Sequence, residues 1–234
     1  MWGYYSYKPR KKPKDTAAQL AKLKKKNPDI NPVTIDGKLA KTWWAQAWNR
    51  NLESYADYDS RLGRGRSYVK NGAVLDLVIT TGEVRALVQG SQVKPYNIVV
   101  KIDPLDRKTW SDITQQCSRQ ISNLEELASG KFPQELTELF TSRGGGLFPS
   151  PKEIKFQCSC PDWASMCKHV AAVLYGIGAR FDEDPMLFFK LRDIDFSELL
   201  KKSVEDKMIN MLKNAGARTS RTMVDVNTYE LFGV

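Results

Sequence analysis

Three of the four cysteines of this chain and its single histidine lie between positions 158 and 169. The local sequence is Cys-x-Cys, six residues, then Cys-x-His, formed by Cys158, Cys160, Cys167 and His169. Thiolate and imidazole groups are the ligands that tetrahedral structural zinc sites use. The pattern predicts one Zn²⁺ ion held by these four side chains.

The spacing of the four residues constrains the local backbone. Residues two apart in a strand point to the same side, so Cys158 and Cys160 can direct both sulfurs at one ion. Two residues in the middle of a helix are rotated by about 200°, but Cys167 and His169 can reach one ion across a helix start, with Ser165 or a neighbour as the cap. We therefore expect a ββα finger with a helix over about 166–175, whose N-terminus favours the thiolate form of cysteine.

Four protein ligands leave no position for water, so the predicted zinc is structural and not catalytic. The alternatives to a metal site are a disulfide or unrelated buried thiols. A reducing cytosol disfavours the disulfide, and the clustering argues against unrelated thiols. Cys117 lies on the apolar face of an expected helix, which favours a core residue over a ligand or nucleophile.

Apolar residues recur with period two between residues 73 and 102, which predicts three antiparallel strands with turns at 81–82 and 90–91. Helical periodicity predicts helices over 41–55 and 109–129, and Pro133 marks the start of a helix that ends at about 141. Helices are also expected over 16–26, between flanking prolines, and over about 196–214. The predicted fold class is α+β: a small antiparallel sheet with packed helices, then the ββα zinc finger and a C-terminal helix.

A triple glycine at 144–146 gives the predicted domain boundary. The predicted units are a basic extended arm (1–32), an α+β domain with a three-stranded meander (33–146), the zinc finger (147–180) and a C-terminal helical segment with a tail (181–234). Trp44, Trp48 and Leu52 share one helical face, which favours core packing over a base-stacking platform.

The net charge of +9 indicates a polyanionic partner, and residues 1–26 alone carry nine basic side chains against one acid. Residues 61–68 contain two glycines and three arginines and are expected to form a flexible basic loop. The alternatives are a solvated tail for the arm and a plain surface loop for 61–68. The candidate phosphate-contacting residues are Lys8, Arg10, Lys11, Lys12, Lys14, Arg61, Arg64, Arg66 and Lys70.

The Cys-x-Cys-x6-Cys-x-His segment, with Pro161-Asp162 after the second cysteine, resembles the SWIM zinc finger. The upstream Thr42-Trp-Trp44, Gly63–Val69 and Val84–Gly90 segments look like those of bacterial SWIM-containing proteins. The resemblance implies binding to DNA or to proteins, and bacterial members are linked with helicase-like ATPases of the remodeller type.

Two hypotheses follow. The first is an accessory protein that binds nucleic acid, DNA rather than RNA, with the arm and the Arg-rich segment on the phosphates. The alternative is an adaptor that docks a helicase-like ATPase or another partner through the finger and the tail 224–234.

Enzymatic activity and a small-molecule substrate are not expected, because zinc uses the single histidine and the triple glycine lacks the Lys-Ser/Thr of a phosphate-binding loop. No stretch approaches the roughly 18 apolar residues of a membrane span, and the N-terminus lacks the apolar region of a secretory signal. We expect no membrane partner and a cytoplasmic location.

Overall fold

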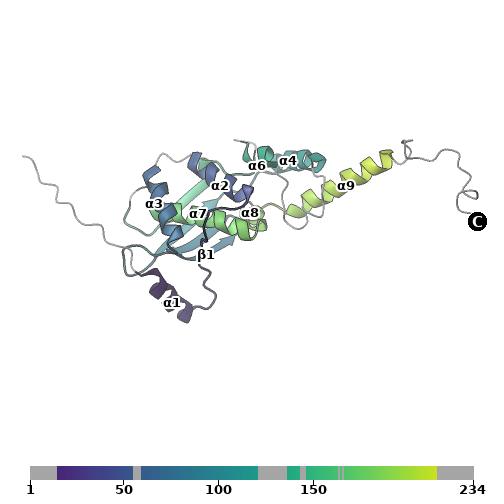
Figure 1. Ribbon diagram of the computed structural model, residues 1–234. Coiled ribbons are helices and arrows are strands. Elements are labelled where there is room, and N and C mark those ends of the chain that lie inside the picture. The colour runs from purple at the N-terminus through teal and green to yellow at the C-terminus, as the bar shows by residue number, and fades with distance from the viewer. Residues whose placement is uncertain are drawn as a thin grey trace, which may run out of the picture.

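A computed structural model describes residues 15–54, 59–120, 136–142, 146–162, 164 and 166–214. The described part has an antiparallel sheet covered on one face by helices, with α9 projecting from one end (Figure 1). The elements are α1 (Thr16–Lys26), α2 (Trp43–Ser54), α3 (Asp59–Lys70), β1 (Val74–Thr80), β2 (Glu83–Val88), β3 (Tyr96–Ile102), α4 (Arg107–Gln120), α6 (Thr137–Thr141), β4 (Ile154–Cys158), α7 (Lys168–Glu183), α8 (Met186–Leu191) and α9 (Phe196–Asn214).

The sheet has the strand order β1-β2-β3-β4, and each neighbouring pair is antiparallel. Gly82 adopts a positive φ of 69° in the turn between β1 and β2, a conformation that glycine adopts without strain. Alternate residues of β3, beginning with Tyr96, are buried, as the period-two pattern requires. The predicted α+β class and three-stranded meander are confirmed.

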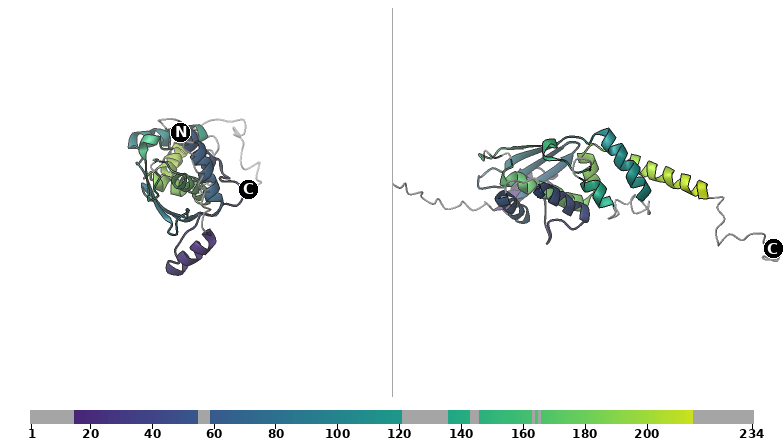
Figure 2. Two further views of the ribbon diagram at one scale, coloured as in Figure 1. Left: turned by 90° about the vertical axis from the view of Figure 1, so that its left-hand side faces the viewer. Right: turned by 90° about the horizontal axis from the view of Figure 1, so that it is seen from above.

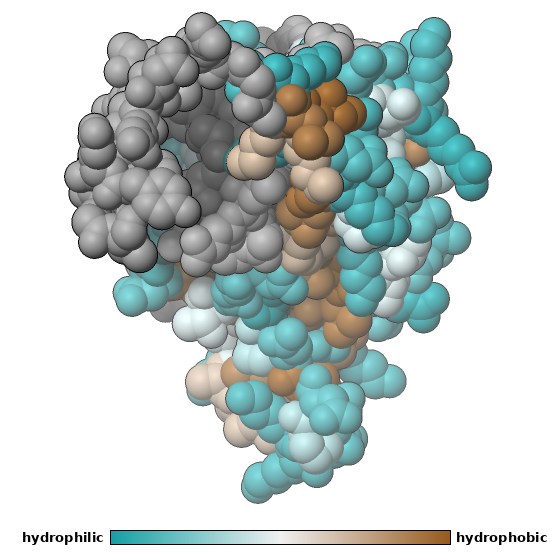
Figure 3. Space-filling view, turned by 90° about the vertical axis from the view of Figure 1, so that its right-hand side faces the viewer, coloured by the Kyte–Doolittle hydropathy of each residue, from teal (hydrophilic) through white to brown (hydrophobic). Residues whose placement is uncertain are grey.

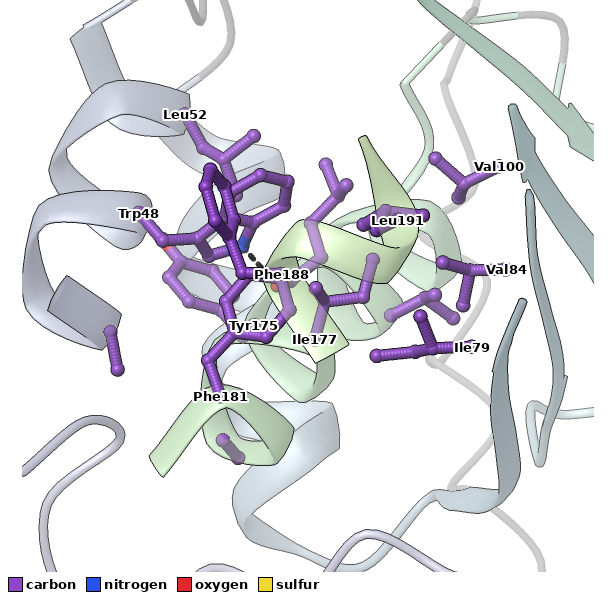
Figure 4. Close-up of a cluster of buried hydrophobic side chains, with 14 of the residues drawn as sticks. Trp48, Leu52, Ile79, Val84, Val100, Tyr175, Ile177, Phe181, Phe188 and Leu191 are labelled. Carbon is purple, nitrogen blue, oxygen red and sulfur yellow. Dashed lines mark hydrogen bonds between the residues drawn. The ribbon is translucent and has the colours of Figure 1, made fainter. Parts of the chain in front are cut away.

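Helix α7 is the centre of the core. Every residue from His169 to Phe181 is buried, because α7 lies between the sheet and the outer helices α2 and α3 (Figures 2 and 4). On the outer side, the indole nitrogen of Trp48 donates a hydrogen bond of 3.0 Å to the carbonyl oxygen of Leu174 (Figure 4). Trp48 is completely buried, so core packing of this helical face is confirmed.

The prediction of a flexible loop at 61–68 is wrong, because these residues belong to helix α3. The buried positions Leu62, Gly65 and Val69 are spaced by three and four residues and face α7. A Cβ atom on Gly65 would lie 2.5 Å from the Cβ of Ala171, so the glycine is what allows close contact of the two helices. Packing energy thus outweighs the low helix propensity of glycine.

The predicted finger is built into the sheet. Its strand β4 pairs with β3, with Ile98 opposite Cys158 and Ile102 opposite Ile154, so the second strand of the ββα unit comes from residues before Gly146. The residues on both sides of Gly146 also share one buried cluster. They are therefore parts of one packed core.

Several predicted helix boundaries need correction. The finger helix begins at Lys168 and continues to Glu183, beyond the predicted 166–175, because the apolar residues after 175 are also core. The helix expected at 109–129 is observed as α4, whereas residues 121–135 lie outside the described part. The helices predicted at 16–26 and 196–214 are confirmed. Among the described residues, no helix combines the length and apolarity needed to cross a bilayer.

The contact between α3 and α7 predicts opposite effects for two glycine substitutions. Gly65→Ala should lower the free energy of unfolding by about 1–2 kcal/mol, since overpacking against backbone outweighs the gain in helix propensity. Gly63→Ala, which meets no atom within 4 Å, should raise it by about 0.5–1 kcal/mol. Urea unfolding followed by circular dichroism measures both; equal effects would contradict the helical packing.

Candidate metal centre

The four predicted ligands come together at the junction of β4 and α7. Cys158 is the last residue of β4, Cys160 follows in the connecting turn, Cys167 is the N-cap of α7 and His169 is its second residue. Their four ligand atoms lie within 4.8 Å of one another. The helix therefore starts between the third and fourth ligands, two residues after the predicted start at about 166.

The distances fit a tetrahedral zinc ion. Nδ1 of His169 lies 3.8 Å from Sγ of Cys167 and 4.0 Å from Sγ of Cys158. Ligand bonds of about 2.0–2.3 Å in a tetrahedron separate nitrogen and sulfur by about 3.5 Å. Three sulfurs and one nitrogen complete the shell of one zinc ion, whose contribution is to the folding of this unit.

The start of α7 stabilises a thiolate at Cys167. The pKa of this thiol is lowered because Cys158 donates a hydrogen bond to it and the backbone N–H groups of Val170 and His169 point at it, against the effect of burial. The same hydrogen bond raises the pKa of Cys158. Because zinc binds the thiolate form, the start of α7 favours the form of Cys167 that acts as a ligand.

Two tyrosines enclose the ligand histidine. The imidazole centroid of His169 lies 4.6 Å from the ring centroid of Tyr96 on β3 and 5.4 Å from that of Tyr68 on α3. Nζ of Lys168 lies 5.9 Å from the centre of the Tyr68 ring. Tyr68, the last residue of the segment expected to form a basic loop, thus packs against the metal site. Only the tertiary contact of α3 with α7 reveals this role.

The candidate phosphate-contacting residues of α3 fall into two groups. Arg61 pairs with Asp162 of the finger, and Arg66 pairs with Glu53 and also donates to the hydroxyl of Tyr175. The other two, Arg64 and Lys70, are exposed. The candidates in the arm, Lys8, Arg10, Lys11, Lys12 and Lys14, lie outside the described residues.

Cys117 stands apart from the cluster. It is fully buried on α4, and burial raises its pKa to about 12. It therefore stays a neutral thiol in the core, as the sequence predicts.

Comparison with known proteins identifies the segment around this site. Residues 151–176 match the family model of the SWIM zinc finger. The chain is 36% identical over 172 residues to the uncharacterized protein Rv2102 of Mycobacterium tuberculosis. The matched region is 73% of this chain and spans 62% of the relative's length. No solved structure matches the chain.

The ligand assignment predicts a metal content that depends on which cysteine is removed. Wild type and Cys117→Ala should each contain about one zinc ion per chain, since Cys117 is outside the cluster. Cys160→Ala and His169→Ala should bind zinc at least about 100-fold more weakly, because an open shell loses a ligand bond. Elemental analysis and chelator competition measure both quantities. Full retention of tight zinc binding in the Cys160 and His169 variants would contradict the assignment.

Proposed function

Because residues 151–176 are a SWIM zinc finger, we propose that the chain is an accessory protein that binds nucleic acid, DNA rather than RNA. The zinc holds the finger in shape, and basic side chains outside the finger contact the phosphates. Such contacts give affinity that depends steeply on salt and little on sequence.

The observation that carries this proposal is the position of the Arg-rich segment. It is a helix packed against α7, and the pair between Arg61 and Asp162 joins it to the finger. Arg64 and Lys70 are exposed on α3. The two charges are therefore held on a rigid element beside the zinc site, which lowers the entropy cost of contacting phosphates.

The basic arm joins the folded part next to the same helix. The hydroxyl of Thr16, at the start of α1, donates to the carbonyl oxygen of Asn71, the residue after Lys70. Helix α1 is anchored further by Gln19, whose amide donates to the carbonyl oxygen of Val93 at 3.0 Å. The start of α1 therefore lies beside the C-terminus of α3.

Exposed lysines extend the basic surface from this junction. They lie along α1 and in the loop that contacts it: Lys22, Lys24, Lys25, Lys26 and Lys94. Together with Arg64 and Lys70 they define the proposed phosphate surface. A polyanion that contacts the arm can therefore also contact α3.

The proposed surface is tested by charge reversal. Arg64→Glu/Lys70→Glu should weaken binding to a DNA duplex by about 10–100-fold and reduce the slope of log affinity against log salt by about 2, because two phosphate contacts are lost. Fluorescence anisotropy at several salt concentrations, with an RNA duplex in parallel, measures both.

The matched control is Arg107→Glu/Lys108→Glu, which makes the same charge change at exposed positions at the start of α4, away from α3 (Figure 1). It should bind within about twofold of wild type if local contacts dominate. Equal losses in the two variants would show that only net charge matters and would overturn the proposed surface.

The second candidate function is an adaptor that docks a helicase-like ATPase. The observation that favours it is the end of α9, seen end-on in Figure 3, where apolar side chains are exposed. They are Val204, Met208, Ile209, Met211 and Leu212. Methionine-rich helix faces adapt well to partner grooves. The tail 224–234, also assigned to this role, lies outside the described residues.

Co-purification distinguishes the two functions. If the adaptor role is correct, an ATPase identified by mass spectrometry should co-purify with wild type and be lost at least about tenfold with Met208→Glu/Leu212→Glu, because buried charges disrupt an apolar contact. DNA affinity should stay unchanged in this variant. Undiminished recovery of the ATPase would contradict docking through α9.

A further inference from the structure

The imidazole of His169 has a defined orientation. Its Nδ1 atom faces the sulfurs of Cys158 and Cys167, at 4.0 and 3.8 Å. Its Nε2 atom is buried and has no hydrogen-bond partner among the described residues. Histidines that bind zinc usually donate the second ring N–H to a carboxylate, a carbonyl oxygen or water. Among the described residues, the ring is in contact with aromatic and backbone neighbours on this side.

Those contacts come from the two tyrosines and from Gly90. The ring of Tyr96 is tilted by 38° over the imidazole, and that of Tyr68 approaches edge-on at 71°. A Cβ atom on Gly90 would lie 3.0 Å from Nε2 of His169 and 2.5 Å from Cε2 of Tyr96. The bare Cα of Gly90 is thus the wall that Nε2 faces.

Gly90 is itself held in place. The fully buried side chain of Gln89 donates hydrogen bonds of 2.9 and 2.8 Å to the carbonyl oxygens of Gly90 and Gln92. The backbone of this loop is therefore fixed from within, and it cannot move away from an added side chain without breaking these bonds.

We propose that His169 binds zinc through Nδ1 and that Gly90 is the positioning residue that sets this choice. A side chain at position 90 displaces the imidazole from the sulfurs, whereas glycine lets the ring seat between Tyr96 and Tyr68 with Nε2 enclosed. The ligand atom is then determined by packing around the ring.

The ligand atom is tested in the full-length wild-type chain loaded with NMR-active cadmium in place of zinc. Binding through Nδ1 places the metal three bonds from Hε1 and four bonds from Hδ2, so a proton–cadmium spectrum should show coupling to Hε1 alone. Binding through Nε2 places both protons three bonds away. Coupling to Hδ2 of comparable size would overturn the assignment.

The role of Gly90 is tested by the rate at which a chromogenic chelator removes zinc. Gly90→Ala should lose zinc at least about tenfold faster than wild type, the size of effect seen when the residues that orient a ligand are changed. Gly63→Ala is the matched control, because its new Cβ meets no atom within 4 Å, and it should release zinc at the wild-type rate. Equal rates in the two variants would overturn the role of Gly90.

A double-mutant cycle separates ligand positioning from general packing. His169→Cys keeps a four-ligand shell but removes the ring that Gly90 faces. In the His169→Cys background, Gly90→Ala should accelerate zinc loss much less than it does in the wild-type background. If Gly90→Ala alone does not fold, the double variant should fold. An undiminished effect, or failure to fold in both backgrounds, would show that the clash with Tyr96 alone matters and would overturn the proposal.

Discussion

The zinc ligands join the edge strand of the sheet to the first turn of its central helix. Cys158 belongs to β4, whereas Cys167 and His169 belong to the start of α7, which the rest of the core surrounds. Metal binding in small zinc units contributes on the order of 10 kcal/mol, comparable to the whole stability of a domain. Because α7 packs against the sheet and against α2 and α3, the position of its first turn affects every layer.

The helix start also explains why the site suits a metal. The N–H groups of the first turn have no partners within the helix, so they stabilise a thiolate at the N-cap position, Cys167. The second ligand on the helix, His169, lies close enough to Cys167 to bind the same ion. Packing by Tyr68 and Tyr96 limits where the ring can go. Backbone electrostatics and side-chain packing thus both favour zinc binding by the four ligand atoms.

The parts of the structure that depend on local spacing could be predicted from the sequence. The four ligands, the meander and α9 each follow from a repeat or a spacing of a few residues. The prediction of a loop at residues 61–68 was wrong because glycine lowers local helix propensity. The helix is stabilised instead by packing of Gly65 against Ala171, which lies more than 100 residues away in the sequence. Tyr68, Tyr96 and Gly90 were missed as parts of the metal site for the same reason: no local pattern links them to His169.

The distribution of charge connects the metal site with the proposed phosphate surface. Zn²⁺ with three thiolates lowers the net charge from +9 to +8, which equals the charge of residues 1–26 alone. The rest of the chain is then formally neutral, so the proposed binding of a polyanion depends on where basic residues are grouped and not on the net charge of the body.

The anchor of the arm shares a loop with the zinc site. Val93 accepts the hydrogen bond from Gln19 of α1, and Gly90, three residues earlier, packs against His169. The side chain of Gln89 holds the backbone between these two points. The same loop therefore carries both the packing contact with His169, at Gly90, and the acceptor for α1, at Val93.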